Sequence, residues 1–378
     1  MERLTIGFLG GGQLARMSAY AAFRLGMMVA IYERAPNSPA SQITPLSFVG
    51  EWEDETTLAR FADCASVITL ENEFIAPKIL QRLESLGKRV YPTSKTIALV
   101  QDKLVQKQTL RANRLTVADF AAIRSAKEAE DFGRTYGYPF LLKSRTGGYD
   151  GYGNRTVASP DEIPAAMSAL GFPARELMAE AFVRFEMELA TIVARSLSGE
   201  VKTYPIVETI QENHICKIVK APASIDDSTK RAARELAEAA IEAIDGVGVF
   251  GVEMFLAKDG TALINELAPR PHNSGHYTIE ACVTSQFENH IRAILNYPLG
   301  DVSMIAPAAV MVNALGKRNC PVSLDSLPNA LRFPRAKAHI YGKADSRLGR
   351  KMGHITVVGD SVEACLSEAT LAESALML

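Results

Sequence analysis

Apolar runs alternate with amphipathic segments along the first 95 residues of the chain. The runs that predict buried strands lie at residues 4–9, 28–32, 66–70 and 89–91. Between them, apolar residues at helical spacing predict helices at residues 13–25, 55–62 and 77–86. Because strand and helix signals alternate, we expect a small parallel sheet with helices on both faces, which is an α/β domain over residues 1–95.

The pattern changes near residue 96. Ser94 is predicted to cap a helix that runs through Leu104. Further helices are predicted at residues 227–243 and 285–295, and strands at residues 139–143, 188–194 and 201–207. This mixture favours an α+β domain on an antiparallel sheet over residues 96–298. Residues 299–378 are expected to form a small β-rich module that ends in a helix, with strands at 309–313, 337–341 and 354–358.

Composition limits the classes of function. The net charge of −2 over 378 residues gives no support for binding to nucleic acid or to an anionic membrane surface. No apolar run approaches the ~20 residues that a membrane helix needs, and no basic leader precedes an apolar segment. The five cysteines are scattered without metal-ligand spacing, which favours a reducing compartment. We therefore expect a soluble, cytoplasmic protein.

The segment GVEMFLAKDGTALINE, which ends at Glu266, predicts a β-hairpin. If the Asp-Gly pair at 259–260 forms a two-residue turn, Ala257 opposes Ala262 and Glu253 opposes Glu266. Directly opposed residues have Cβ atoms about 4.5–5.5 Å apart, where like charges are destabilising. A divalent cation such as Mg²⁺ would relieve this repulsion. The alternative is a β-bulge that shifts the register and leaves one glutamate on a solvated face.

A glycine-rich turn joins the first predicted strand to the first helix. Gly10, Gly12 and Ala15 follow the dinucleotide-binding spacing, and Glu33 ends the next strand. The motif is typical of a Rossmann-like domain and, taken alone, indicates a nicotinamide enzyme. A tight turn with close helix–strand packing explains the same glycines, with some other small substrate bound there.

A second glycine-rich segment follows Lys143, which ends an apolar run. Four glycines fall within residues 147–153, and such a loop can fold its backbone N–H groups over phosphate oxygens. The segment lacks the Gly-Lys-Ser/Thr of a P-loop. We interpret it as a nucleoside triphosphate site in which Lys143 contacts phosphate. A glycine-rich hairpin tip beside a solvated lysine is the alternative.

The segment NELAPRPHNSGH, residues 265–276, is dense in polar side chains directly after the predicted hairpin. Arg270 offers a planar cation to an anionic reaction centre, unless it forms an interdomain salt bridge. His272 and His276 have the i, i+4 spacing that suits zinc on a helix, but the Asn-Ser-Gly between them favours a loop.

A basic cluster lies near the C-terminus. Its members are Lys343, Arg350 and Lys351, with His354 close by. Such a cluster forms either a solvated surface or a site for a phosphate-bearing substrate.

Together these motifs resemble the ATP-grasp superfamily and, within it, the N5-carboxyaminoimidazole ribonucleotide synthases of purine biosynthesis. The similarity covers nearly the whole chain and rests on residues 10–14, 69–73, 101–103, 148–151, 265–276, 285–287, 341–343 and 349–354. It implies an ATP-grasp fold with a Rossmann-like N-terminal domain, a central domain with a mobile lid at roughly 117–182, and a small C-terminal module.

The resemblance also implies the reaction and its partners. ATP would phosphorylate bicarbonate, and the resulting carboxyphosphate, or CO₂ released from it, would carboxylate 5-aminoimidazole ribonucleotide with release of ADP and phosphate. Mg²⁺ or Mn²⁺ would assist, and the chain would form a homodimer.

Each matching residue takes an implied role. ATP binding is implied for Lys103, Lys143, Gly148, Tyr149, Asp150, Gly151, Tyr152, Gly153, Asn154, Glu180, Ala181, Phe182, Val183, Glu188, His214, Asn265 and Glu266. Binding of the ribonucleotide is implied for Gln13, Leu14, Glu71, Tyr149, Asn273, Lys343, Arg350 and Lys351. The implied catalytic residues are Arg270, His272, Ser274 and Lys343. The implied metal ligands are Glu253 and Glu266.

Tyr152 departs from the family's pattern, because an Arg or Lys is usual at this place in the loop. The missing cation predicts weaker binding or slower use of bicarbonate, unless another base supplies the charge.

Three alternative functions remain open. A formate-using glycinamide ribonucleotide transformylase resembles the chain at Glu71, Lys343 and Arg350, although Asn273 and the Tyr-Asp pair at 149–150 fit the carboxylating family better. A nicotinamide-dependent oxidoreductase would rest on the first glycine turn alone. A non-catalytic nucleotide-binding regulator is the third alternative.

Overall fold

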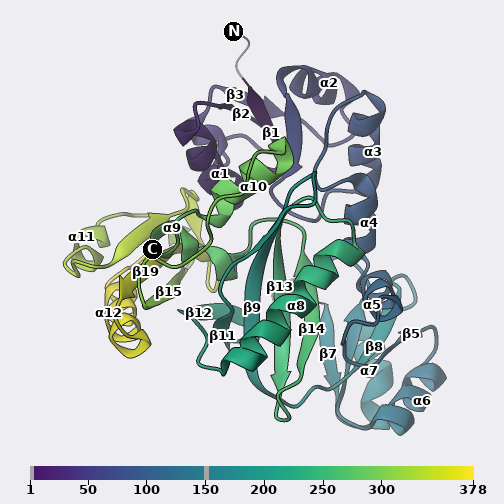
Figure 1. The fold of residues 1–378 in the computed structure, drawn as a ribbon. Coiled ribbons are helices and arrows are strands. Elements are labelled where there is room, and N and C mark those ends of the chain that lie inside the picture. The colour runs from purple at the N-terminus through teal and green to yellow at the C-terminus, as the bar shows by residue number, and fades with distance from the viewer. Residues whose placement is uncertain (1–3, 149–152) are drawn as a thin grey trace.

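The computed structural model describes residues 4–148 and 153–378, so the predicted loop residues Tyr149, Asp150, Gly151 and Tyr152 lie outside the described residues. Three sheets dominate the described part of the chain (Figure 1): a parallel sheet in the N-terminal domain, a long antiparallel sheet in the middle, and a smaller antiparallel sheet in the lobe at lower right. The predicted combination of α/β and α+β architecture is confirmed.

The N-terminal sheet is parallel, with strand order β3-β2-β1-β4. Its strands are β1 (Thr5–Leu9), β2 (Met28–Glu33), β3 (Leu46–Val49) and β4 (Val67–Leu70). Helices α1 (Gln13–Arg24), α2 (Glu55–Cys64) and α3 (Pro77–Ser85) pack around it. Two details differ from expectation. The pattern did not indicate β3, whose alternate residues are exposed, and residues 89–91 contribute only a bridge between Ile68 and Val90.

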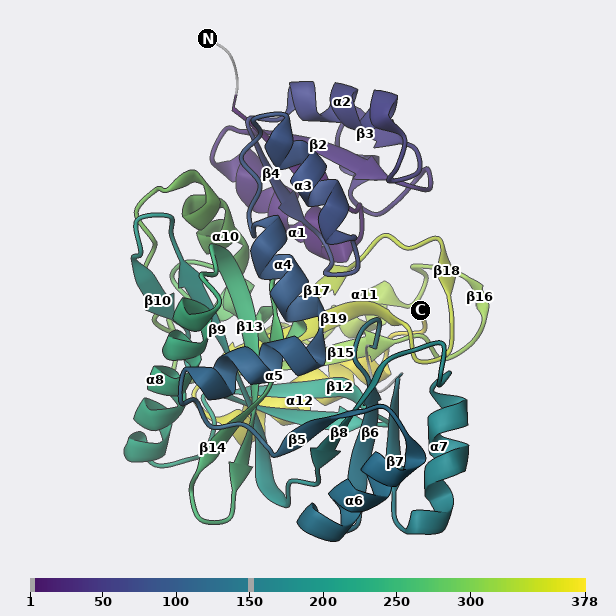
Figure 2. The same ribbon diagram turned by 90° about the vertical axis from the view of Figure 1, so that its right-hand side faces the viewer.

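The predicted single helix from Ser94 to Leu104 is two helices, so this prediction was wrong. Thr93 caps α4 (Ser94–Gln101) by accepting a hydrogen bond from the Thr96 N–H. Asp102 then leaves the helical conformation and caps α5 (Lys103–Ala112) with its carboxylate. The two caps bend the chain, and Figure 2 shows α4 descending from the N-terminal domain and α5 turning sharply away from it, toward α8.

The central sheet of the described residues has nine strands, of which eight follow the order β14-β13-β9-β11-β12-β15-β19-β17. The strands from the middle of the chain are β9 (Phe185–Arg195), β11 (Val207–Glu212), β12 (Ile215–Ala221), β13 (Gly248–Ala257) and β14 (Ala262–Ala268), and β10 (Val201–Thr203) pairs with β9. The predicted strand at 201–207 is therefore two strands. Pro205 separates them because it has no N–H to donate to a ladder.

Helices cover both faces of this sheet. Helix α8 (Asp227–Ala243) has the predicted bounds and packs alanines against Leu189, Val193 and Phe250. Helix α10 (Gln286–Leu295), capped by Ser285, packs between the opposite face and α1 of the N-terminal domain. The short helix α9 (Thr278–Ala281) precedes it. These helices fix the central sheet against the N-terminal domain.

The three longer C-terminal strands continue the central sheet instead of forming a sheet of their own. Strand β15 (Ala308–Leu315) pairs with β12, and β19 (Lys351–Gly359) and β17 (Lys337–Ile340) follow outward. The remaining elements are β16 (Cys320–Pro321), α11 (Leu327–Ala330), β18 (Asp345–Ser346) and α12 (Val362–Ser374). The boundary at 298/299 stays a prediction, since no break in the sheet marks it.

The small lobe is a four-stranded antiparallel sheet among the described residues, with order β5-β8-β6-β7. Its strands are β5 (Phe120–Ile123), β6 (Phe140–Ser144), β7 (Asn154–Val157) and β8 (Leu177–Ala181). Helices α6 (Ala126–Tyr136) and α7 (Ile163–Ala169) bury its apolar residues on one side. This lobe falls within the segment predicted as a lid.

The turn of the β13–β14 hairpin differs from the two-residue turn that the sequence predicted. The Ala257 N–H donates to the Thr261 carbonyl, so three residues form the loop. Gly260 has φ +83°, a conformation that glycine adopts without strain. Leu256, not Ala257, pairs with Ala262, and the register near the turn is displaced by one residue.

A β-bulge then restores the register. Met254 pairs with Ile264, but Glu253 pairs with Glu266, so Asn265 is the extra residue on β14. The predicted opposition of Glu253 and Glu266 is confirmed because two one-residue displacements cancel. The bulge that we considered as an argument against the pairing is the feature that produces it.

Candidate active site

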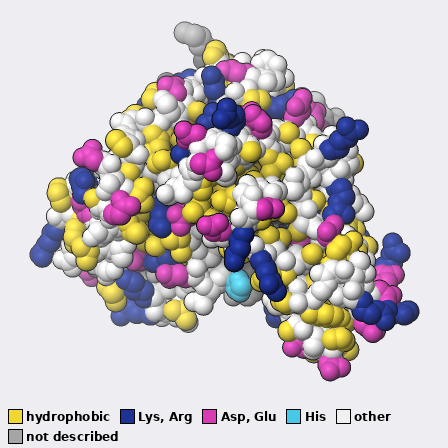
Figure 3. Space-filling model, turned by 60° about the horizontal axis from the view of Figure 1, so that its bottom comes forward, with side chains coloured by type: hydrophobic (Ala, Val, Ile, Leu, Met, Phe, Trp, Pro, Cys, Tyr) yellow, Lys and Arg dark blue, Asp and Glu magenta, His cyan; other side chains and the backbone are white. Residues whose placement is uncertain are grey.

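A cavity of about 1070 Å³ lies where the N-terminal domain, the central sheet, the small lobe and the C-terminal strands meet. Figure 3 shows a hollow between the lobe at lower right and the main body, with Lys or Arg side chains and a histidine at its edge. Predicted site residues that line the cavity are Gln13, Leu14, Glu71, Lys143, Gly148, Asn154, Phe182, Glu188, His214, Glu253, Asn265, Glu266, Arg270, His272, Asn273, Lys343, Arg350 and Lys351.

Some predicted residues lie outside this lining. Among the described residues these are Lys103, Gly153, Glu180, Ala181, Val183 and Ser274. Lys103 and Ser274 still contact lining residues, because the Lys103 ammonium is 2.7 Å from Glu266 Oε1 and the Ser274 hydroxyl is 2.9 Å from His272 Nδ1.

The bulge on β14 explains why two consecutive side chains face the cavity. Along a regular strand, neighbours point to opposite faces. On β14, Ile264 and Leu267 are buried in the core beneath α8, whereas Asn265 and Glu266 both line the cavity. A regular strand would place only one of them there. The extra residue therefore adds one polar ligand to this wall.

Three carboxylates gather on the cavity face of the central sheet. Burial, together with the charges of Glu266 and Glu188, raises the pKa of Glu253 to about 7. Burial also raises the pKa of Glu188. Burial works to lower the pKa of Lys103, but Glu266 beside it raises that pKa above its ordinary value. The charges of Lys351 and Lys103 lower the pKa of Glu253 but do not outweigh burial and the neighbouring acids, so the cluster suits a divalent cation.

A flat apolar surface adjoins these acids. The rings of Phe185 and Phe255 stack with their centroids 4.7 Å apart and 12° between their planes. Both line the cavity, as does Phe182. Such a surface suits a planar base, and the acids beside it suit metal-bound phosphates.

The first glycine turn holds carboxylates in the place where a dinucleotide would bring its pyrophosphate. The Glu71 carboxylate accepts from the Leu14 N–H at 3.3 Å, and Glu33 accepts from the Gly11 N–H at 2.9 Å. A Cβ on Gly12 would lie 2.2 Å from Glu71 Oε1. Gly12 therefore allows the close approach of a protein carboxylate, and the nicotinamide interpretation of this turn is not supported.

Arg270 forms the interdomain ion pair that we considered as its alternative role. Its guanidinium makes a two-pronged contact with Glu73 of the N-terminal domain, with Nη2 2.7 Å from Oε1. Burial alone would raise the pKa of Glu73, but Arg270 holds it below its ordinary value. Both residues line the cavity. Sequence reasoning quoted Glu73 within a motif but gave it no role.

His272 is neutral and oriented. Burial lowers its pKa well below the ordinary value, and Arg270 lowers it further. Its Nδ1 accepts from the Ser274 N–H, which leaves the ring hydrogen on Nε2, 3.5 Å from Glu253 Oε1. His276 instead contacts Gln286 through Nδ1. The Nδ1 atoms of the two rings therefore have different partners, and the zinc interpretation gains no support from them.

The opposite end of the cavity is amide-rich and basic. Asn273 and Asn313 exchange hydrogen bonds between their side-chain amides, and Asn313 also donates to the Cys216 carbonyl. The Lys343 ammonium donates to the Lys351 carbonyl at 2.7 Å. The predicted basic cluster therefore lines a cavity instead of a flat surface, which suits an anionic substrate.

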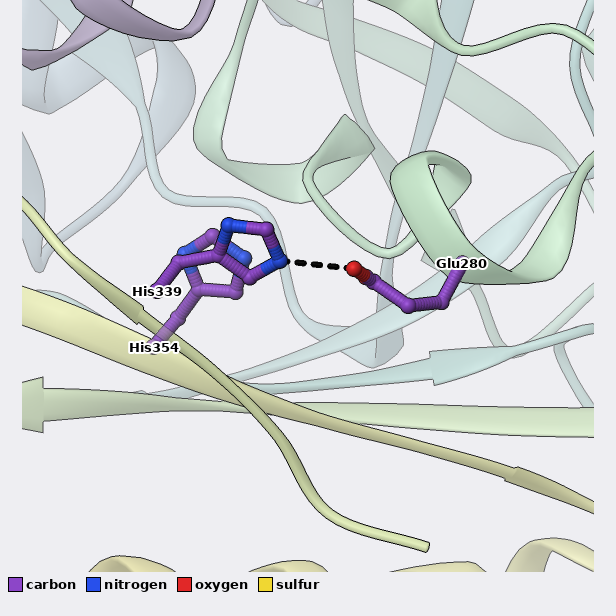
Figure 4. Close-up of side chains that lie close together, drawn as sticks. All are labelled: Glu280, His339 and His354. Carbon is purple, nitrogen blue, oxygen red and sulfur yellow. Dashed lines mark hydrogen bonds and ion pairs between the residues drawn. The ribbon is translucent and has the colours of Figure 1, made fainter. Parts of the chain in front are cut away.

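A second histidine group lies deeper, between α9 and the C-terminal strands. Glu280, His339 and His354 have ligand atoms within 4.8 Å of one another (Figure 4). His339 Nε2 is 2.6 Å from Glu280 Oε1, and the two rings stack with 11° between their planes. Lone pairs lie in the ring planes, so parallel stacked rings cannot both reach one ion at the ~2.0–2.1 Å of a Zn–N bond. The group joins α9 to β17, and its stacked rings do not fit a single metal ion.

Sequence reasoning missed several residues that line the cavity. These include Glu73, Phe185, Gln211 and Phe255. Phe255 carried a signal, since period-2 alternation places it on the same face as Glu253. Phe185 carried none, because the same alternation places it on the face opposite to Glu188. No local sequence pattern indicated Gln211, because Glu188, to which it hydrogen-bonds, lies on another strand.

Family models match the three parts of the chain in order. A ribonucleotide synthetase preATP-grasp domain matches residues 3–101, an ATP-grasp domain matches 108–287, and a phosphoribosylaminoimidazole carboxylase C-terminal domain matches 309–368. The fold and these matches define the chain as an ATP-grasp carboxylate–amine ligase.

Similar proteins indicate the family of ATP-grasp ligases to which the chain belongs. The chain is 41% identical over 353 residues to the N5-carboxyaminoimidazole ribonucleotide synthase of Synechococcus elongatus, covering 93% of this chain and 89% of that protein. It is 43% identical to the phosphoribosylaminoimidazole carboxylase of Ogataea methanolica, covering 97% of this chain and 68% of that longer protein. A crystal structure of N5-carboxyaminoimidazole synthase from Aspergillus clavatus, in complex with ADP and 5-aminoimidazole ribonucleotide, superposes with a TM-score of 0.91 at 38% identity, covering 99% and 98% of the two chains. The chain belongs to the N5-carboxyaminoimidazole ribonucleotide synthase family.

Proposed function

We propose that this enzyme uses ATP to carboxylate the amino group of 5-aminoimidazole ribonucleotide with bicarbonate. The observation that carries the proposal is one cavity with two chemically different ends. One end has the opposed acids Glu253 and Glu266 beside Lys103, and the other has Glu71, Asn273 and Lys343. Membership of the family supports the same reaction.

ATP binds at the end formed by the central sheet and the small lobe. Phe182, Phe185 and Phe255 provide the apolar surface for adenine, and Glu188 lies close enough to them to accept from the ribose. Lys143 faces the phosphates from the lobe. Glu253 and Glu266 fit Mg²⁺, because their mutual repulsion needs a cation and Mg²⁺ uses one or two carboxylates plus phosphate oxygens. An ion held by these two residues would neutralise charge on the transferring phosphoryl group.

Bicarbonate lies between the two ends, next to Arg270 and His272, and Ser274 contributes by holding the His272 ring. An oxygen of bicarbonate attacks the γ-phosphorus and ADP leaves, which gives carboxyphosphate. The amine of the ribonucleotide then attacks the carboxyl carbon, either of carboxyphosphate or of CO₂ released from it. Phosphate leaves and the amine loses a proton. Arg270, held by Glu73, stays fixed while charge develops, so that little reorganisation is needed.

The ribonucleotide occupies the basic end. Glu71, whose pKa is raised by burial, sits at the N-terminus of α1 next to Gln13 and Leu14. Lys343, Arg350 and Lys351 face its phosphate from the C-terminal strands. Closure of the lobe over the cavity keeps water from the acyl phosphate.

The decisive experiment is release of ADP. We expect ADP only with bicarbonate and 5-aminoimidazole ribonucleotide together, at a rate that depends on Mg²⁺. Turnover with formate and glycinamide ribonucleotide instead would favour the transformylase, and NADH binding without ATP dependence would favour the oxidoreductase. Intact ATP bound without turnover would favour the regulator.

We also propose a cytoplasmic homodimer. All five cysteines are free thiols, which suits a reducing compartment. None of the described helices has the length and apolar character to cross a membrane.

The dimer contact is proposed at Val283 and Ile305, which are exposed by 58% and 63%. They lie on two segments joined by the Cys282–Met304 bridge and offer an apolar surface. Light scattering should give twice the chain mass, and a charge at Val283 should lower it.

A further inference from the structure

Lys107 is a deeply buried cation that has no place in the function described so far. It lies on α5, where its side chain is 3% exposed, and it does not line the cavity. Its ammonium is 2.7 Å from Glu180 Oε2, and the Glu180 side chain is 1% exposed. Burying an ammonium is costly unless an opposite charge pairs with it, and even a buried ion pair is weak evidence for stability. The buried Lys107–Glu180 pair therefore calls for a functional explanation.

Glu180 holds a second lysine with its other oxygen. The Lys143 ammonium is 2.8 Å from Glu180 Oε1, and Lys143 reaches the cavity from β6. The three groups thus form a row from Lys107 in the interior, through Glu180 on β8, to Lys143 at the cavity wall. One carboxylate between two ammonium groups has an excess of positive charge when both are protonated. The cavity end of the row is where an anion would balance it.

We propose that Lys107 is the permanent counter-ion of Glu180 and thereby a positioning residue that lets Lys143 leave Glu180 for a phosphate of the nucleotide. The inference rests on the proposed function, in which Lys143 faces ATP. Without Lys107, moving Lys143 to a phosphate would leave the buried carboxylate unpaired, and such a charge is strongly unfavourable. With Lys107 in place, one ion pair is exchanged for another and Glu180 stays neutralised.

The position of Lys107 on α5 fits this role. Lys103 lies one turn earlier on the same face of the helix and pairs with Glu266 on β14. The Gln106 side chain accepts from the Leu267 N–H of β14. Helix α5 therefore contacts strand β14, which carries Glu266, through Lys103 and Gln106. It contacts the small lobe through Lys107. Of these two lysines on α5, Lys107 is the one that shares the Glu180 carboxylate with Lys143.

The test is equilibrium binding of MgADP and steady-state kinetics of Lys107→Met. Loss of the inner cation should bind Lys143 more tightly to Glu180, so we expect Kd for MgADP and KM for ATP to rise at least tenfold. KM for 5-aminoimidazole ribonucleotide should change less than twofold. Lys127→Met, at an exposed lysine on α6 of the same lobe, should leave every parameter unchanged.

A second variant separates this role from simple packing. In Lys107→Met/Glu180→Gln the neutral amide needs no counter-ion, so Kd for MgADP should return to within threefold of the Glu180→Gln value. If the double variant binds as weakly as Lys107→Met, or if the ATP and ribonucleotide parameters worsen equally, the inference is overturned. Lys107→Gln, which keeps a hydrogen-bond donor, serves if the methionine variant does not fold, and should show the same selective weakening. Failure of wild-type protein to bind MgADP would refute the proposed function, whereas wild-type Kd in Lys107→Met refutes only this inference.

Discussion

Two pairs of charged side chains lie on the walls of the same cavity and differ in how completely they are neutralised. Glu73 and Arg270 form a matched ion pair between the N-terminal domain and the central domain. Glu253 and Glu266 are a like-charged pair on neighbouring strands, with Lys103 as the only cation that contacts them by an ion pair among the described residues. The pKa values move in opposite directions: Arg270 outweighs burial and lowers that of Glu73, whereas burial and Glu266 raise that of Glu253.

The difference distinguishes a charged pair that stabilises the fold from a charged pair that is suited to bind a ligand. The matched pair contributes to stability and positions Arg270, because each charge satisfies the other. In the like-charged pair only Glu266 has a cationic partner, Lys103, and under the proposed function a bound Mg²⁺ would compensate the remaining repulsion, which otherwise lowers the stability of the ligand-free protein. Strain of this kind is characteristic of sites that bind charged ligands. Changes at the two pairs should therefore have different consequences for activity and for stability.

The largest expected effect is on turnover in Glu266→Gln. Loss of this proposed metal-ligand carboxylate should reduce ATP turnover by about 10²–10³-fold, the size found when one group that stabilises transition-state charge is removed. Circular dichroism and thermal melting should show an intact fold. The measurement is ADP release at saturating Mg²⁺, with Glu212→Gln at the exposed end of β11 as control. Wild-type ADP release in Glu266→Gln would refute the metal assignment.

The second effect is on stability in Glu73→Gln. The change leaves Arg270 without its partner, and because both side chains are about one-fifth exposed, we expect a loss of about 2 kcal/mol, less than for a fully buried pair. Denaturant unfolding measures it. Glu53→Gln, which breaks the exposed pair with Lys78, should change stability by less than about 0.5 kcal/mol.

The same variant has a defined pH dependence. The pKa of Glu73 is lowered in the folded state, so the pair's contribution is complete above the unfolded value of about 4.5 and disappears as the pH falls through the folded value. The stability gap between wild type and Glu73→Gln should thus be constant from pH 6 to 8 and narrow below about pH 4.5. A gap that widened on acidification would contradict the assignment.

A third, smaller effect concerns the basic end of the cavity. Lys343→Ala should raise KM for 5-aminoimidazole ribonucleotide by about tenfold, the equivalent of ~1.4 kcal/mol, with a smaller change in KM for ATP. Lys337→Ala, at an exposed position of β17, is the control. If only the ATP parameter moved, the ribonucleotide would have to bind elsewhere.

The two pairs also differ in how well the sequence predicts them. The hairpin brought Glu253 and Glu266 together in the prediction because they lie 13 residues apart on strands joined by one turn. Even so, the prediction depended on a turn and a bulge whose displacements cancel. Glu73 and Arg270 lie 197 residues apart. Nothing in the local pattern of either residue indicates the other, so this pair required the tertiary structure.

The fold shows the same division between local and long-range information. The bounds of α8 were predicted because Asp226 caps it and apolar residues recur at helical spacing. The break at Asp102 was missed because the apolar pattern continues through it, and only the capping geometry reveals the second helix. The C-terminal strands were located as strands, but their pairing with β12 is a long-range contact that periodicity does not encode.

The smallest expected effect is also the sharpest test of the comparison: Glu253→Gln should stabilise the ligand-free protein. The raised pKa means that ionised Glu253 opposes folding at pH 8, by less than the full shift implies because the side chain is 34% exposed. In EDTA we expect a gain of about 1 kcal/mol and a higher Tm, whereas Glu266→Gln should gain less, since it also removes the partner of Lys103. At saturating MgADP the wild type should become more stable than Glu253→Gln. A ligand at 100 times its Kd stabilises the wild type by about 2.7 kcal/mol, and Glu253→Gln binds MgADP poorly. A lower Tm for Glu253→Gln in EDTA would mean that its contact with His272 outweighs the repulsion, and the distinction between the two pairs would fail.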